Sequence, residues 1–167
     1  ALSAYNPEFP IPKNPWGKEL WAGVSSSGSG VAVAAGLCFA AIGTDTGGSI
    51  RYPAMANGVT GLKPTYGRVS RHGVLALAES LDHVGPMARS VADAVALYNA
   101  ITGYDENDQT SLNREDAQIA QPAVTNLNGL RLGVDADWFS YGTDPGLLAA
   151  LEQAVGVLKT LGMECVP

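Results

Sequence analysis

The chain has 167 residues, of which 46% are hydrophobic, and it carries a formal net charge of −6 at pH 7. This length and composition are typical of one globular domain with a buried core, and the lack of a basic patch argues against a nucleic-acid partner. No stretch reaches the roughly 18 consecutive apolar residues of a membrane-spanning helix, and two cysteines are too few for a disulfide framework.

The first 22 residues predict an extended, packed segment without a helix, because they contain four of the ten prolines. The sequence begins at Ala1 and not at methionine, so we expect the natural N-terminus to be missing. These residues also lack the basic and then apolar layout of a secretory signal. We therefore expect a cytoplasmic protein.

Two glycine- and serine-rich loops then bracket an apolar segment. The first loop spans residues 25–30 (SSSGSG) and the second spans residues 44–49 (TDTGGS). Between them the residues predict a helix over 29–36, with a strand as the alternative, and then a buried strand over 37–42. Such a strand delivers the second loop at its carboxyl end, where open α/β sheets bind ligands. The alternative is that both loops are plain turns.

The middle of the chain predicts short elements around one clear helix. Residues 54–89 contain several glycines and no sustained period, which favours turns and short strands. Ser90 is predicted to cap a helix that ends at Gly103, because Asp93 stands at the capping-box position and apolar residues repeat at helical spacing. Residues 104–128 are polar and predict a solvated loop; a cation site is the alternative, but the spacing of a calcium loop is absent.

The C-terminal part predicts a strand, a helix and a second strand. The strands cover residues 130–135 and 164–166, and the helix runs from Pro145 to Leu161. Asp144 suits the N-cap and a proline suits the first helical position. A strand, helix, strand unit argues for an α/β fold.

The two loops belong to a longer pattern. The dinucleotide fingerprint, the phosphate loop and the GxSxG nucleophile elbow are all absent. Instead the sequence reads GVSSSG at residues 23–28, GTDTGGSIRYPA at 43–54, GVTGLKPT at 58–65 and SLDHVGPMARS at 80–90. This pattern resembles the signature of the amidase signature family and covers most of residues 14–110. Val24 and Ser27 stand where the commonest family pattern has glycine.

The resemblance implies an α/β fold in which a mixed, twisted β-sheet is covered by helices on both faces. The chain would then be the central portion of a single amidase-signature domain. Its parts would be a lead-in loop (1–22), a signature core (23–103), a polar loop (104–129) and a β-α-β segment (130–167). The resemblance implies a small-molecule amide as the partner and neither a cofactor nor a metal.

The resemblance also implies a Ser-Ser-Lys mechanism. Ser49 would attack the amide carbonyl, and Ser25, which follows a cis peptide bond in the family, would relay the proton to a neutral lysine. The oxyanion would be stabilised by the backbone N–H groups of Thr46, Gly47, Gly48 and Ser49. Supporting roles are expected for Ser26, Asp45, Arg51 and Asp82, and the substrate pocket is expected near Thr46 and Tyr52.

The catalytic lysine has no counterpart in this sequence. The family lysine lies tens of residues before the first serine loop, whereas only Lys13 and Lys18 precede Ser25 here, in a proline-rich setting. We therefore expect a central piece of a longer enzyme, with the remainder of the amidase chain as its partner. Alone it should be inactive, because a serine hydroxyl without a base stays protonated.

Three functions remain open at this point. They are amide hydrolysis, a role in a glutamine-dependent amidotransferase that passes ammonia to a partner chain, and a non-catalytic binding domain. A Ser-His-Asp triad is also open, in which His72 or His83 would pair with Asp82 or Asp45 to activate Ser49. A homodimer is left open as well.

Overall fold

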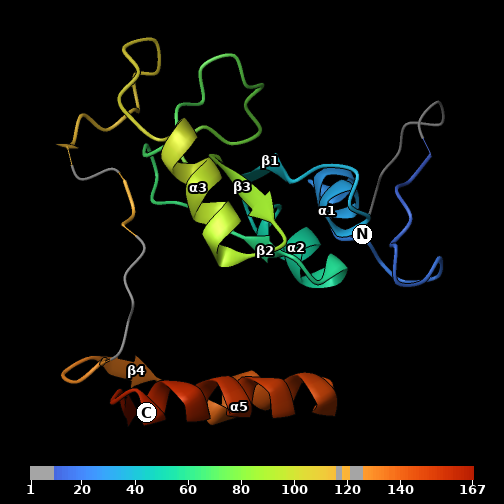
Figure 1. Ribbon diagram of the computed structural model, residues 1–167, viewed down its shortest axis with the longest axis vertical. Coiled ribbons are helices and arrows are strands. Elements are labelled where there is room, and N and C mark those ends of the chain that lie inside the picture. The colour runs from blue at the N-terminus through green and yellow to red at the C-terminus, as the bar shows by residue number, and fades with distance from the viewer. Residues whose placement is uncertain (1–9, 116–117, 121–125) are drawn as a thin grey trace. The chain divides into compact units, whose positions relative to one another are not determined.

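The computed structural model describes residues 10–115, 118–120 and 126–167. The chain divides into two compact units, Ala1–Gln121 and Pro122–Pro167, each with its own helices and strands (Figure 1). Residues 10–22 contain neither a helix nor a strand, as the prolines predict. The remaining residues of the expected lead-in loop, 1–9, lie outside the described part of the chain.

The first unit is built on a small antiparallel sheet. Its strands lie in the order β1-β3-β2, and β3 pairs with both neighbours. The register sets Asp45 of β1 opposite His83 of β3. The elements of this unit are α1 (Ser27–Ala34), β1 (Ala40–Asp45), α2 (Arg51–Asn57), β2 (Thr60–Gly61), β3 (His83–Ala88) and α3 (Val91–Ile101).

Helices cover both faces of this sheet. Met87 of β3 packs with Ile50 and Ala54, at the start of α2, whereas Val84 packs with Tyr98 of α3. Because side chains alternate along a strand, positions 84 and 87 point to opposite faces. The α/β arrangement expected from the sequence, with helices on both sides of a sheet, is therefore confirmed (Figure 1).

The elements around the two loops differ from the sequence prediction. Helix α1 begins at Ser27, so four of the six residues of the predicted first loop are helical. Strand β1 begins at Ala40 and not at residue 37, and it includes the first two residues of the predicted second loop. The segment before β1 is not buried, since Leu37 is 78% exposed and Phe39 is 87% exposed.

Helix α2 was missed by the sequence analysis. Its third residue is Pro53, which argues against a helix when read alone. Proline is tolerated in the first helical turn, however, because the N–H that it lacks would have no intrahelical partner there. Gly58 ends the helix with a φ of 66°, a left-handed conformation that glycine adopts without a steric penalty.

Helix α3 follows the sequence prediction closely. Ser90 is the N-cap, and its Oγ accepts a hydrogen bond from the backbone N–H of Asp93 at 3.1 Å. The hydroxyl also donates to the Asp93 carboxylate at 2.7 Å. Helix α3 is thereby fixed at the end that joins β3.

The second unit is the predicted strand, helix, strand. Strands β4 (Arg131–Gly133) and β5 (Glu164–Val166) pair in parallel, and α5 (Pro145–Thr160) connects them. Asp144 caps α5 by accepting a hydrogen bond from the N–H of Gly146. The short helix α4 (Ala136–Ser140) was missed, although its N-cap Asp135 is a recognisable signal. No helix in the described part of either unit is long and apolar enough to cross a membrane.

We predict that Ser90→Ala lowers the stability of the protein by about 1 kcal/mol, because it leaves a first-turn N–H of α3 without its acceptor. Thermal unfolding measures the change. Ser80→Ala is the matched control, since Ser80 is exposed and makes no hydrogen bond among the described residues. Equal midpoints for the two variants would contradict the capping role of Ser90.

Candidate active site

The second loop folds around the carboxylate of Asp45, which is fully buried. This carboxylate accepts hydrogen bonds from the backbone N–H groups of Gly48 at 2.7 Å, Ile50 at 3.1 Å and Arg51 at 3.3 Å. The Arg51 side chain adds two more, from Nε at 3.0 Å and Nη2 at 2.9 Å. Asp45 therefore fixes the backbone between the end of β1 and the start of α2.

These contacts keep Asp45 ionised. Burial alone would raise the pKa of this carboxyl group, because it disfavours the charged form. The hydrogen bonds from the Arg51 side chain and from the three backbone N–H groups outweigh burial and lower the pKa from 3.8 to about 2. The same pairing raises the pKa of Arg51. The pair is charged at neutral pH.

Ser26 joins the first loop to the second. Its Oγ accepts a hydrogen bond from the N–H of Thr44 at 3.0 Å and donates to the Thr44 carbonyl at 3.2 Å. Its backbone N–H donates to the carbonyl of Ser49 at 3.1 Å. Ser26, which follows Ser25, thus holds the first loop against the second loop at Thr44 and at Ser49.

A pair of glycines makes room for this junction. Gly43 and Gly85 face each other across β1 and β3. A Cβ at Gly43 would lie 2.8 Å from Ser26 Oγ and 3.1 Å from the Ile50 side chain, and a Cβ at Gly85 would also lie 3.1 Å from Ile50. The side chain of Ile50 therefore fills a hollow over the two glycines, and we call this arrangement the glycine socket.

The two serines with the expected catalytic roles have free hydroxyl groups. Ser25 is exposed and Ser49 is half-buried, and within the described residues neither Oγ makes a hydrogen bond. The Val24–Ser25 peptide bond is cis, as the resemblance implied. Both hydroxyls are therefore available for contacts with a substrate or a base.

One of the four expected oxyanion donors is occupied. The N–H of Gly48 donates to Asp45 Oδ1 at 2.7 Å and is therefore engaged within the loop in this structure. The N–H groups of Thr46, Gly47 and Ser49 donate to no other group in the described part of the chain. The backbone can therefore offer three donors at this loop.

A cavity of about 390 Å³ opens beside Ser25. Thr46 lines it, as expected, but Tyr52 does not. Tyr52 instead packs near Trp21, with 6.2 Å between the ring centres. The other lining residues are Thr44, Arg71, His72, Val74, Leu75, Ala76, Leu77, Glu79, Asp82, His83, Val84, Asn107, Asp108, Gln109 and Thr110.

Asp82 ties the cavity wall to the second loop. Its carboxylate accepts hydrogen bonds from the N–H groups of Leu77 at 2.8 Å and Ala78 at 3.0 Å, and from the hydroxyl of Thr46. Burial would raise the pKa of Asp82, but these hydrogen bonds outweigh it and lower the pKa. Asp82 is thus a fixed acceptor that holds Thr46.

The histidines do not form a Ser-His-Asp triad with either candidate carboxylate. His83 Nδ1 lies 2.6 Å from the carbonyl of Leu81 and 3.2 Å from the carbonyl of Asp45, so it carries the proton and donates. The carboxylates of Asp45 and Asp82 bond to other groups and orient neither ring. A triad needs a carboxylate that orients the histidine, and His72 and His83 have none from this pair.

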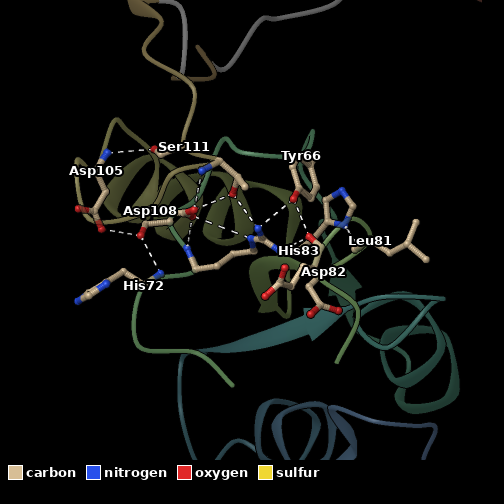
Figure 2. Close-up of polar contacts among 12 residues, drawn as sticks. Tyr66, His72, Leu81, Asp82, His83, Asp105, Asp108 and Ser111 are labelled. Carbon is tan, nitrogen blue, oxygen red and sulfur yellow. Dashed lines mark hydrogen bonds and ion pairs between the residues drawn. The ribbon is translucent and has the colours of Figure 1, made fainter. Parts of the chain in front are cut away.

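The polar segment predicted as a solvated loop contributes a wall of the cavity, so that prediction is wrong for part of it. Asp108 is buried and Asp105 is half-buried. Figure 2 shows Asp105, Asp108 and Ser111 on one side of a polar cluster, with Tyr66 and His83 on the other. The carboxylate of Asp108 accepts a hydrogen bond from the backbone N–H of Arg71 at 2.8 Å. The carboxylate of Asp105 accepts one from the hydroxyl of Ser70 at 2.6 Å.

The sequence analysis missed Arg71, Asn107, Asp108, Gln109 and Thr110 as lining residues of the cavity. The available signal was weak, because 37 residues separate Arg71 from Asp108 and no local pattern links them. Within the described residues, no lysine lines the cavity and no cluster of three metal-ligating side chains occurs.

Comparison with known proteins gives the family. A family model described as Amidase matches residues 1–167. The chain belongs to the amidase family. One glutamyl-tRNA(Gln) amidotransferase subunit, from Desulfotalea psychrophila, is 49% identical over 158 residues, which make up 95% of this chain and 33% of that protein.

Solved amidase-family structures share the fold. The corresponding glutamyl-tRNA(Gln) amidotransferase subunit from Thermotoga maritima matches with a TM-score of 0.83 and 41% identity, over 92% of this chain and 34% of that one. Peptide amidase from Stenotrophomonas maltophilia matches with a TM-score of 0.76 and 42% identity, over 93% and 32%. The chain thus spans about a third of the length of the amidase-family proteins that it matches.

We predict that Asp45→Asn lowers the free energy of unfolding by about 2 kcal/mol at pH 7, because donors of the second loop lose their acceptor. The substitution should also flatten the acid dependence. The folded-state pKa lies below its ordinary value, so the stabilisation by Asp45 is present above pH 3.8 and is lost as the pH falls towards about 2.

Thermal unfolding between about pH 7 and pH 2 measures both effects. Glu19→Gln is the matched control, since Glu19 is exposed and makes no hydrogen bond among the described residues. An Asp45→Asn variant with the same acid dependence as the control would contradict the assignment.

Proposed function

We propose that the protein cleaves amide bonds through an acyl-enzyme on Ser49, with Ser25 relaying the proton to a lysine outside these 167 residues. The observation that carries the proposal is the hydrogen bond from the N–H of Ser26 to the carbonyl of Ser49. It brings the residue that follows Ser25 against the second serine, while both hydroxyls keep their hydrogen-bonding capacity.

In this mechanism Ser49 Oγ bonds to the amide carbon and gives its proton to Ser25. Ser25 passes its own proton to the lysine, which then protonates the leaving nitrogen as the C–N bond breaks. The developing oxyanion accepts hydrogen bonds from Thr46, Gly47 and Ser49 N–H. Each such donor is typically worth about 3 kcal/mol of transition-state stabilisation. Water then attacks the ester and releases the acid.

The surrounding residues keep these groups in place. Ser26 holds the first loop on Thr44, and Asp45 with Arg51 holds the second loop on α2. Asp82 holds the side chain of Thr46. Side chains fixed in this way lose little entropy during the reaction, which is the usual advantage of a preorganised site.

A second candidate function is that of a chain in a glutamine-dependent amidotransferase, in which the released ammonia passes to a partner chain. The observation that favours it is the 49% identity to proteins named as glutamyl-tRNA(Gln) amidotransferase subunits. The chemistry at Ser49 would be the same, and only the fate of the ammonia would differ.

We predict that Ser49→Ala abolishes labelling by a fluorophosphonate probe in the protein encoded by the complete reading frame, and that its melting temperature stays within about 1 °C, because the change removes one partly exposed hydroxyl. Ser25→Ala should lower kcat by a factor of about 10² to 10⁴, with a smaller effect on KM, because it removes the proton relay. Ser29→Ala serves as the control from the neighbouring helix turn.

Labelling that survives in Ser49→Ala would overturn the assignment of the nucleophile. A complete protein with Ser25 and Ser49 intact that neither reacts with the probe nor cleaves any amide would favour the non-catalytic alternative.

We predict that the fate of the amide nitrogen distinguishes the two candidate functions, amide hydrolysis and a role in an amidotransferase. The complete protein is purified with any chains that accompany it and is given glutamine labelled with ¹⁵N in its amide. Free ammonia as the sole ¹⁵N-labelled product, beside unlabelled glutamate and without an accompanying chain, supports hydrolysis. Transfer of ¹⁵N to an acceptor, which stops when the accompanying chains are removed, supports the amidotransferase.

A further inference from the structure

Two segments far apart in the sequence line the cavity beside Ser25 and form two of its walls. One wall comes from residues 71–79 and the other from residues 107–110. The first wall is largely apolar, with Val74, Leu75 and Leu77. The second wall is polar. The contacts that join these two walls therefore set the shape of the cavity.

Arg71 is the residue that joins the walls. Its Nη1 donates to the carbonyl of Glu79 at 2.5 Å, and its Nη2 donates to the hydroxyls of Tyr66 at 2.9 Å and Thr110 at 2.8 Å. The guanidinium carbon also lies 4.8 Å from the centre of the Tyr66 ring. The guanidinium group of Arg71 thus contacts both walls, through Glu79 and Thr110, and also the side chain of Tyr66.

Asp108 completes the junction from the wall formed by residues 107–110. Its Oδ2 accepts from the backbone N–H of Arg71 at 2.8 Å and lies 4.0 Å from Arg71 Nε. Its Oδ1 accepts from the N–H of Thr110 at 2.9 Å and from the Thr110 hydroxyl at 2.7 Å. The side chains of Arg71 and Asp108 are only 13% and 7% exposed.

This burial separates Arg71 from a direct role in binding. Within the described part of the chain, Arg71 Nε is buried without a hydrogen-bond partner, and both Nη atoms are already bonded to protein groups. Gln109 instead presents an exposed side chain to the cavity, and its amide group makes no hydrogen bond within the described residues. Residues 107–110 can therefore contact a substrate through Gln109, while Arg71 holds this wall in place.

The size of the cavity indicates which part of a substrate it receives. The leaving group of a primary amide is ammonia, which is far too small to need about 390 Å³. The acyl group is the remaining part of such a substrate. A cavity with an apolar wall and a polar wall suits an acyl chain that carries a polar group, since such pockets fix orientation with a few placed polar atoms.

We propose that Arg71 is a positioning residue for acyl-group selectivity, which it exerts by holding residues 107–110 as the polar wall of the cavity beside Ser25. This inference rests on the proposed amidase function. Arg71 acts through Asp108 and Thr110, and Gln109 makes the contact with the acyl group.

The test compares Arg71→Lys, Thr110→Val and Gln109→Ala with wild type in the protein from the complete reading frame. Lysine keeps the charge but cannot reach three segments at once, and valine removes the hydroxyl shared by Arg71 and Asp108. The measurement is kcat/KM for primary amides from acetamide to glutamine, normalised to the fraction of Ser49 that a fluorophosphonate labels. Glu106→Gln is the control, because Glu106 is exposed on the same segment and does not line the cavity.

All three variants should change the ratio of kcat/KM between glutamine and acetamide by about tenfold or more, because a displaced or missing polar wall affects only the acyl chain that reaches it. In Arg71→Lys and Thr110→Val, amide hydrogen exchange at positions 71 and 110 should also accelerate, whereas Gln109→Ala should leave it unchanged. Glu106→Gln should match wild type in both measurements.

An active wild type whose variants lose activity equally on every amide would overturn the inference, because a merely structural role lowers all rates together. Unchanged hydrogen exchange in Arg71→Lys would also overturn it. A wild type that cleaves no member of the series would contradict the proposed function itself, and the inference would fall with it.

Discussion

The site depends first on one buried carboxylate with five hydrogen bonds. Asp45 ends β1, and the backbone N–H groups and arginine side chain that follow it all turn back towards that residue. The loop needs no regular secondary structure, because the carboxylate satisfies donors that a helix or strand would otherwise satisfy. Removing the Arg51 side chain would leave the fully buried carboxylate of Asp45 without its compensating charge, which is costly. The second loop is therefore rigid, although part of its surface is open to solvent.

This rigidity is passed on to the rest of the site through short polar links. Ser26 connects the first loop to Thr44 and Ser49, and Asp82 connects Thr46 to the turn at residues 77–78. Each link joins segments that come from different parts of the chain. The two loops and residues 77–78 of the cavity wall therefore keep one geometry, which is what the proposed proton relay between Ser49 and Ser25 requires.

Features that depend on contacts between residues close in sequence could be predicted, whereas features that depend on tertiary packing could not. The caps at Ser90 and Asp144 were correct because a cap is a contact between residues two or three apart. The loop residues were located through their resemblance to a family. The junction of Arg71 with Asp108 was not predicted, since it depends on tertiary packing across 37 residues. Helix α2 was missed because the helix-breaking tendency of Pro53 holds for helix interiors and not for a first turn.

The glycine socket links the side-chain volumes at positions 43, 50 and 85. Ile50 follows Ser49 directly, and its side chain occupies the hollow over Gly43 and Gly85. Added volume at Gly43 would crowd the Ile50 side chain and Ser26, so it has to be offset by a smaller side chain at position 50 or by a shift of Ser26. At Gly85 an added Cβ would lie 2.2 Å from the carbonyl oxygen of Leu62, so a smaller side chain at position 50 alone makes no room there. In evolutionary terms, relatives that carry a larger residue at 43 should carry a smaller one at 50, whereas position 85 should stay glycine.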